Sequence, residues 1–376
     1  MYGTVENSSL RVLGAPREYV QGPGAFDELP HLAARHGKGN LLAVIDGFLF
    51  DSLSKRLERL FAARGQHVIC LRFAGEATRS EGERIVAAMG EADVVAGIGG
   101  GKCIDIGKFA GLHGRKPVFS IPTVASNDAP TSRLIVLYTE DHAVAGTEFL
   151  AYNPDLVLVD TDIIAAAPPR LLRAGIGDAL TKLYEARATA QSNGANSFSA
   201  RAPFLGRRLG EICREVIHRA GPPVLNALAH GERHADFEEL VETLVLVSGV
   251  TFESGGLSVA HSMIRGLTRV HALAGYLHGE HVAYSTLVQI VIEGDATELA
   301  DAVVFNRSIG LPASLREFGV GPEALDATAE AIAADTMTAP YITNFPRKLE
   351  ARDIVEAILK LESLIETSEF PADAGH

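Results

Sequence analysis

Three segments of the sequence combine residue types that can bind a phosphate, a polar substrate or a metal ion. The first runs from Gly97 to Lys102 and follows an apolar stretch, with a helix expected over 104–110. Glycines let the backbone approach a ligand closely, and free N–H groups at a helix start favour phosphate. The run is not a Walker A loop, because Ala96 and Cys103 replace the glycine and the hydroxyl residue of that motif. It predicts a phosphate-binding loop, with a tight strand-to-helix turn as the alternative.

The second segment covers residues 121–132 and concentrates hydroxyl groups around the carboxylate of Asp128. It follows a short apolar run, 117–121, that is typical of a buried strand. Parallel sheets bind ligands outside the carboxyl ends of their strands, where such a segment would lie. The alternative is a surface turn rich in Pro, Asn and Asp.

The third segment, 175–180, contains Asp178, which is either the N-cap of a helix or a metal ligand. The metal interpretation needs partners, and His261, His271, His278 and His281 are the candidates. One carboxylate and two neutral imidazoles suit zinc and leave a coordination position for substrate. If 256–274 is one straight helix, His261 and His271 lie about 15 Å apart and cannot bind the same ion. His271 would then be a packed or snorkelling side chain on the apolar stripe of that helix, and glycines near His278 would let His278 turn back toward His261.

The hydrophobic pattern predicts the strands, helices and domains that position these segments. Apolar runs at 41–45, 67–71, 93–98, 117–121 and 156–160 alternate with helical stretches, which indicates a parallel sheet covered on both faces. After the Pro168-Pro169 pair the chain is mostly helical, and a stripe near its end (Ile354, Ile358, Leu361, Ile365) is typical of a core-facing helix. We therefore expect an α/β domain over 1–165 and an α-helical domain over 166–376.

Composition limits the function classes. The 376 residues are 47% hydrophobic and 22% charged, as in compact globular chains of two or three domains. A net charge of −13 repels polyphosphate backbones and so argues against nucleic acid as a partner. Three unpaired cysteines, no export signal and no uncharged apolar run of membrane-spanning length predict a cytoplasmic protein without a membrane partner.

Together with Ala260-His261 and the segment 277–280, these motifs resemble the glycerol dehydrogenase family, within the iron-containing alcohol dehydrogenases and dehydroquinate synthases. The matching residues span 41–282 in the family's order. The resemblance implies an N-terminal α/β domain with a mostly parallel, Rossmann-like sheet, an all-α C-terminal domain, and an active site in the cleft between them. It also implies a homo-oligomer, octameric in the family.

The resemblance implies NAD as cofactor, with its diphosphate on Gly99, Gly100 and Gly101 and its adenosine ribose near Asp46. Lys102 and Asp105 belong to the same motif and are expected at the cofactor. The nicotinamide and substrate side would be lined by Thr123, Ser126, Asp128, Ser132, Leu134, Val136 and Tyr138. The implied metal ligands are Asp178, His261 and His278, with zinc as the ion and Asp128 positioning a substrate hydroxyl.

Departures from the family pattern and rival functions refine this expectation. Lys182 and Arg265 occupy the positions where iron-type members carry histidine, and Asn127 stands where polyol dehydrogenases commonly have threonine. The expected function is hydride transfer between a small vicinal diol, glycerol first, and NAD; propane-1,2-diol, butanediol and hydroxyacetone fit the same chemistry. The alternative is a dehydroquinate synthase-like lyase, which would need a cationic cluster where only Arg265 and Arg269 are basic. A metal-free binding relative is a third possibility, disfavoured by the intact metal residues.

Overall fold

The computed structural model describes residues 5–367 and divides the chain into two compact units. One is Gly14–Pro168; the other begins at Pro169 and includes the described residues before Gly14. The expected boundary near 165 lies close to this division, but residues 5–13 group with the helical unit rather than with the α/β domain. Two hydrogen bonds explain this: the Arg201 backbone N–H donates to Leu10 O over 2.9 Å, and the Asn196 side-chain Nδ2 donates to Val12 O over 2.9 Å.

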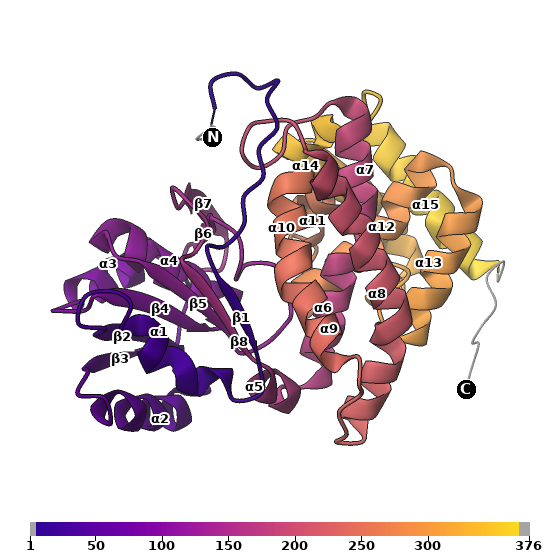
Figure 1. Cartoon of the computed structure of the whole chain (residues 1–376). Helices are drawn as coiled ribbons and strands as arrows, with labels where there is room; N and C mark the ends of the chain where they lie inside the picture. Colours follow the sequence, from indigo (N-terminus) through magenta and orange to yellow (C-terminus); the bar gives the residue numbers. More distant parts are fainter. Residues whose placement is uncertain (1–4, 368–376) are drawn as a thin grey trace. The chain divides into compact units, whose positions relative to one another are not determined.

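A six-stranded parallel sheet forms the centre of the α/β unit, as predicted (Figure 1). Its strands are β1 (Tyr19–Gly22), β2 (Leu41–Asp46), β3 (Val68–Phe73), β4 (Val94–Gly99), β5 (Val118–Pro122) and β8 (Leu156–Asp160), in the spatial order β1-β8-β5-β4-β2-β3. Of these six strands, the hydrophobic pattern missed β1, a half-buried edge strand of four residues that carries no continuous apolar run. It also predicted no strands at 134–138 and 144–149, which pair with each other outside this sheet.

Helices cover both faces of this sheet because its strands are apolar on both sides. In β2, Leu41, Ala43 and Ile45 face the cluster that includes α2 (Phe50–Ala62). Leu42 and Val44 face the opposite cluster, which includes α3 (Arg79–Ala87) and α4 (Gly101–Gly114). The remaining helices of the unit are α1 (Leu29–Ala33), α5 (Thr161–Ala166) and the 3₁₀ turn Ala25–Glu28.

A separate antiparallel hairpin, β6 (Leu134–Tyr138) and β7 (Val144–Phe149), follows β5. In β6, Ile135 and Leu137 are buried in the core, while Leu134 and Val136 are half-buried on the other side of the strand. Tyr138 follows a break in the pairing register and packs against the same core as Ile135 and Leu137. Of the β6 residues expected at the nicotinamide, Leu134 and Val136 therefore share one face, as the period of two in a strand requires.

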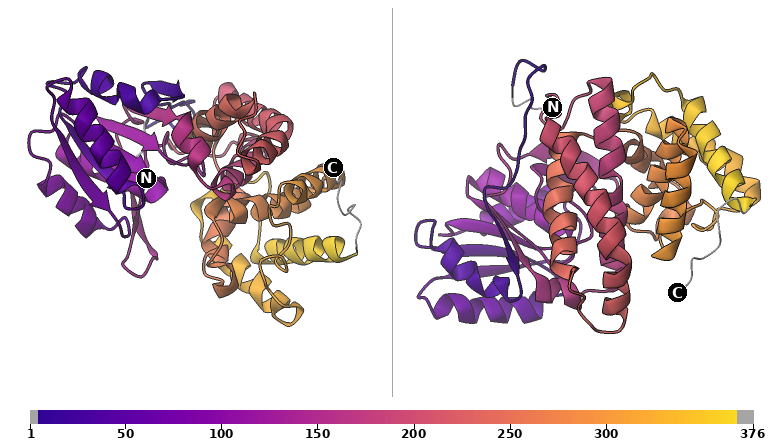
Figure 2. Two further views of the ribbon diagram at one scale, coloured as in Figure 1. Left: turned by 90° about the horizontal axis from the view of Figure 1, so that it is seen from below. Right: turned by 45° about the vertical axis from the view of Figure 1, so that its right-hand side comes forward.

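The helical unit consists of α6 (Pro169–Leu180), α7 (Lys182–Ser192), α8 (Phe204–Ala229), α9 (Phe237–Glu242), α10 (Ser248–Gly255), α11 (Val259–Leu267), α12 (His278–Glu293), α13 (Ala296–Ser308), α14 (Leu325–Thr336) and α15 (Ala351–Glu366), with a π turn at Thr243–Val247 and 3₁₀ turns at His271–Leu273, Pro322–Ala324 and Pro340–Asn344. Helix α15, yellow in Figure 2, lies against α12 and α14. Its residues Ile354, Ile358 and Leu361 are fully buried and Ile365 is partly buried, which confirms the predicted stripe.

The expectation of one straight helix over 256–274 is wrong. Helix α11 ends at Leu267, Val270 is extended, and a 3₁₀ turn begins at His271. His271 is exposed rather than packed, so it is not part of the apolar stripe of α11. The separation of about 15 Å between His261 and His271 was based on a straight helix. It therefore no longer excludes His271 as a ligand.

Among the described residues, no single helix has the length and apolar character needed to cross a membrane. Only the pair Phe237–Gly255 and Val259–Leu267, bent by 100°, meets the length and composition criteria when taken together.

Candidate functional site

The sheet topology brings Asp46 and the glycine run together. The chain leaves β2 toward β3 on one side and returns to β4 on the other, so the carboxyl ends of β2 and β4 flank the switch point where sheets of this kind bind ligands. Ile45 pairs with Ile98, which places Asp46 next to Gly99. A Cβ added to Gly99 would lie 2.9 Å from the Cβ of Asp46.

The glycines of the run have two different roles. A Cβ on Gly97 would lie 2.8 Å from Ile104 Cα, so this glycine lets α4 pack against β4. Gly100 is the N-cap of α4, has no side-chain cap, and would bring a Cβ near only Val124, at 3.9 Å. The first turn of α4 thus presents backbone N–H groups beside open space, as an anion site requires.

The segment 121–132 lies directly against the glycine run, because β5 is the neighbour of β4. Thr123 N–H donates to Gly99 O over 3.1 Å, and Asn127 Nδ2 lies 3.0 Å from the position that a Cβ of Gly101 would take. Ser126 and Asp128 are half-buried beside them. Residues that the sequence assigned to cofactor and substrate are thus neighbours within the α/β unit.

Two of the expected cofactor residues, Asp105 and Ser132, are buried and take part in an internal network. The fully buried Lys108 ammonium donates to Asp105 Oδ1 over 3.0 Å, to Ala129 O over 2.6 Å and to Leu134 O over 2.9 Å, and reaches Ser132 Oγ at 3.4 Å. Burial raises the pKa of Asp105, although Lys108 opposes the shift. The network holds the segment after β5 in place; a direct contact of Asp105 or Ser132 with cofactor stays a prediction.

Lys102 points to a carboxylate and an aromatic ring. Its Nζ lies 2.5 Å from Glu76 Oε1 and 4.8 Å from the centre of the Tyr138 ring. Burial, together with Asp105 and Glu76, raises the pKa of Tyr138 to about 12, so its phenol is neutral at physiological pH. Lys102 thus forms an ion pair with Glu76, and it does not need the nucleoside triphosphate that a Walker A lysine binds.

In the helical unit, Asp178 is not an N-cap, so the interpretation of its motif as a helix start is wrong. It lies near the end of α6, a helix that begins nine residues earlier at Pro169. The glycines around it serve packing: a Cβ on Gly177 would lie 2.4 Å from Gly279 O of α12. Backbone contact between α6 and α12 therefore sets the spacing between Asp178 and His278, the first residue of α12.

Three predicted ligands form one group, in which the nearest ligand atoms of Asp178, His261 and His278 all lie within 4.8 Å of one another. Asp178 Oδ1 is 3.4 Å from His261 Nε2 and 4.0 Å from His278 Nε2. Asp178 Oδ2 is buried and accepts no hydrogen bond. The exposed His271 does not belong to this group.

Charges around the group oppose one another. Burial disfavours the charged forms, but Lys182 and the imidazoles hold the pKa of Asp178 below its ordinary value. For His261, burial and Lys182 lower the pKa, yet Glu185 and Asp178 raise it to about 9. A metal ion would therefore compete with a proton for His261 Nε2.

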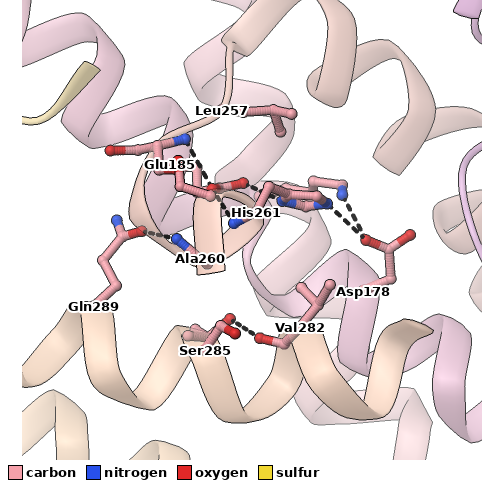
Figure 3. A network of polar contacts seen from close by, with 12 residues as sticks. Asp178, Glu185, Leu257, Ala260, His261, Val282, Ser285 and Gln289 are labelled. Atoms are coloured by element: carbon pink, nitrogen blue, oxygen red, sulfur yellow. Dashed lines mark hydrogen bonds and ion pairs between the residues drawn. The ribbon is translucent and has the colours of Figure 1, made fainter. Parts of the chain in front are cut away.

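Two neighbours of the group were missed as site residues. Lys182 Nζ lies 2.9 Å from Asp178 Oδ1, and Glu185 Oε2 lies 2.6 Å from His261 Nδ1. Figure 3 shows Glu185 and Asp178 on opposite sides of the His261 ring. Their spacing, four and seven positions after Asp178, is typical of one helical face and was present in the sequence, although α6 ends at Leu180 and both residues belong to α7.

Comparisons with known proteins agree with these motifs. A family model described as iron-containing alcohol dehydrogenase matches residues 20–168. Glycolaldehyde reductase of Halobacterium salinarum is 37% identical over 86% of this chain and 89% of its own length. Glycerol dehydrogenase of Escherichia coli O6:H1 is 33% identical over 93% of this chain and 96% of its own. The crystal structure of glycerol dehydrogenase from Schizosaccharomyces pombe has a TM-score of 0.90 and 30% identity, covering 97% of this chain and 95% of that one.

Proposed function

Because the chain belongs to the glycerol dehydrogenase family of iron-containing alcohol dehydrogenases, we propose that it transfers hydride between a small vicinal diol and NAD with the help of zinc. Glycerol, oxidised to dihydroxyacetone, is the first candidate substrate. The observation that supports this most directly is the group of Asp178, His261 and His278. The lyase alternative is disfavoured, since Arg265 donates to Thr338 O and Arg269 pairs with Asp335, which leaves neither aimed at the metal group.

The residues present fit a zinc ion. Ligand atoms about 2.0–2.1 Å from zinc in a tetrahedral site are about 3.4 Å apart, and the two measured separations are 3.4 and 4.0 Å. The unpartnered Asp178 Oδ2 is a further acceptor buried at the same place. When bound, zinc would act as a Lewis acid that lowers the pKa of a substrate hydroxyl and favours hydride loss from its carbon.

Residues of the α/β unit supply binding and orientation in this proposal. The N–H groups at the start of α4 would bind the diphosphate, and the Asp46 carboxylate would accept hydrogen bonds from the ribose hydroxyls. Asp128 would orient the hydroxyl next to the reacting one. Ser126 and Asn127 lie beside Asp128, so they are the residues through which this chain would select its diol.

The decisive experiment follows absorbance at 340 nm with NAD+ and a panel of glycerol, propane-1,2-diol and butanediol, and with NADH and hydroxyacetone or glycolaldehyde. The proposal predicts NADH formation from a vicinal diol, lost after chelation and restored by zinc. Reduction of glycolaldehyde without diol oxidation would move the substrate class toward that of the Halobacterium relative. Phosphate release without net NADH would support the lyase instead.

Cofactor choice can be tested at Asp46, which lies beside Gly99 at the switch point. A carboxylate accepts hydrogen bonds from both ribose hydroxyls but repels a 2′-phosphate, which costs several kcal/mol, or on the order of a hundredfold in affinity. We expect the protein to prefer NAD, and Asp46→Ser to narrow the preference by at least about tenfold in kcat/KM. Equal efficiency with NAD and NADP before the substitution would contradict this role.

The diphosphate site can be tested at Gly100, whose surroundings leave space for a side chain. Gly100→Val should therefore fold normally but exclude the diphosphate, raising the KM for NAD by at least about tenfold. Melting temperature and steady-state kinetics measure the two effects separately. An unchanged KM in a folded Gly100→Val protein would place the dinucleotide elsewhere.

Zinc affinity should depend on pH because of His261. Since its pKa is raised to about 9 by Glu185 and Asp178 against burial, zinc must displace a proton at any lower pH. Apparent affinity should rise by at least about tenfold per pH unit from pH 6 to 8. Competition titrations with a chelator at three pH values measure this slope, and a flat profile would show that His261 is neutral in the metal-free protein.

We also propose a cytoplasmic location and a homo-oligomeric state. Cys70, Cys103 and Cys213 form no disulfide in the described part of the chain, as expected in a reducing compartment. The exposed Phe204 and Leu205 at the start of α8 are apolar residues that subunit contacts would cover. Light scattering of the purified protein would give the number of chains.

A further inference from the structure

Glu185 on α7 collects three hydrogen bonds from the segment that carries His261. Its Oε1 accepts from Ser258 N–H over 2.8 Å and from His261 N–H over 2.9 Å. Its Oε2 lies 2.6 Å from His261 Nδ1. Figure 3 shows Glu185 beside His261. The Glu185 side chain is fully buried, so water does not compete for these bonds.

The two carboxylate oxygens have separate tasks. Ser258 is the N-cap of α11 and provides no side-chain cap, so Oε1 takes over the role of accepting N–H bonds at the start of that helix. Oε2 faces a ring nitrogen and can only accept from it. The ring must therefore carry its proton on Nδ1, which leaves Nε2, on the side of Asp178, as the nitrogen that can bind a metal.

We propose that Glu185 is a positioning residue that fixes both the direction of the His261 ring and the tautomer in which Nε2 is available to zinc. The inference rests on the proposed function, because it gives Glu185 a role only if His261 binds a metal. If the inference is correct, part of the zinc affinity of the Asp178, His261 and His278 group depends on Glu185, which is not itself a ligand.

Replacing Glu185 by glutamine separates the tautomer from the shape. An amide has one acceptor oxygen, so it cannot accept from the backbone and from Nδ1 at once. Keeping its oxygen on the two backbone N–H groups preserves two bonds and turns the NH2 group toward Nδ1. That arrangement favours the tautomer with the proton on Nε2, which excludes the metal. Glu185→Ala removes the same charge and the cap but leaves the tautomer free.

The test measures zinc affinity by chelator competition, and the melting temperature of the metal-free form, for wild type, E185Q and E185A. The matched control is E362Q, since Glu362 is also buried and accepts from a backbone N–H, Leu315, without touching a metal ligand. We expect E185Q to bind zinc about 10–100-fold more weakly than wild type and E362Q. It should also bind zinc more weakly than E185A while melting at a higher temperature.

The outcomes are distinguishable. The inference is supported if E185Q binds zinc more weakly than E185A although E185Q is the more stable of the two. If Glu185 were merely structural, the less stable variant would also bind zinc more weakly. Zinc affinity of E185Q within about threefold of wild type, or weakest binding by the least stable variant, overturns it. Failure of the wild-type protein to bind zinc contradicts the proposed metal site and, with it, any role of Glu185 toward zinc.

Discussion

Replacing His261 with alanine should abolish tight zinc binding and lower turnover by at least about a thousandfold. Three ligands are the minimum of a catalytic zinc site, and an alcohol without a Lewis acid is a poor hydride donor at neutral pH. His261 is less exposed than His278, the other histidine of the group, so water reaches its position less readily as a substitute ligand. Elemental analysis of purified protein gives the zinc content, and steady-state kinetics gives turnover.

The matched control for this change is His271→Ala. His271 is exposed in the 3₁₀ turn after α11 and lies outside the ligand group. Zinc content and turnover should therefore stay within about twofold of wild type. Full zinc occupancy in the His261 variant, or loss of zinc only in the His271 variant, would refute the proposed ligand set.

Substituting Gly279 with alanine should damage the site without touching a ligand. The added Cβ would lie 1.7 Å from Ala174 O, a backbone atom of α6 that cannot rotate away. The two helices must separate, which costs about 1–3 kcal/mol and corresponds to a fall in melting temperature of about 2–10 °C. Because Asp178 and His278 lie on these helices, zinc affinity should fall by at least about tenfold.

Gly275→Ala is the control for that experiment. Gly275 has no heavy atom within 4 Å of its added Cβ and is not among the glycines with positive φ. Alanine should be accommodated there with little change in stability or zinc affinity. If Gly279→Ala behaved like Gly275→Ala, the close approach of α6 and α12 would not be what spaces Asp178 and His278.

The sequence predicted the strands that consist of continuous apolar residues, because such a run is recognisable without knowledge of its partners. Strands β2, β4, β5 and β8 are apolar runs buried on both faces, so their existence follows from composition, and their parallel direction from their alternation with helical stretches. Strand β1 has no such run and is stabilised by pairing with β8, a partner far along the chain. The break after Leu267 was missed because the helical pattern continues beyond the residue at which the backbone changes direction.

The ligand residues were identified from motifs, whereas the residues that support them depend on contacts between helices. Asp178, His261 and His278 carry recognisable neighbours in the sequence. Glu185 acts through an approach of α7 to the start of α11, and the glycine motif around Asp178 was taken for a helix start when it is a packing surface. Spacing indicates which residues share a helix face, but it does not say which other helix that face meets.

The discontinuous helical unit has a consequence for how the chain is made. The α/β unit, Gly14–Pro168, is contiguous, and both β1 and its partner β8 have left the ribosome once its last residues emerge. The helical unit needs residues before Gly14 together with Arg201 and everything that follows. We therefore expect the α/β unit to fold first during synthesis, while the segment around Arg11 stays without its partner until α7 and the turn after it have been translated.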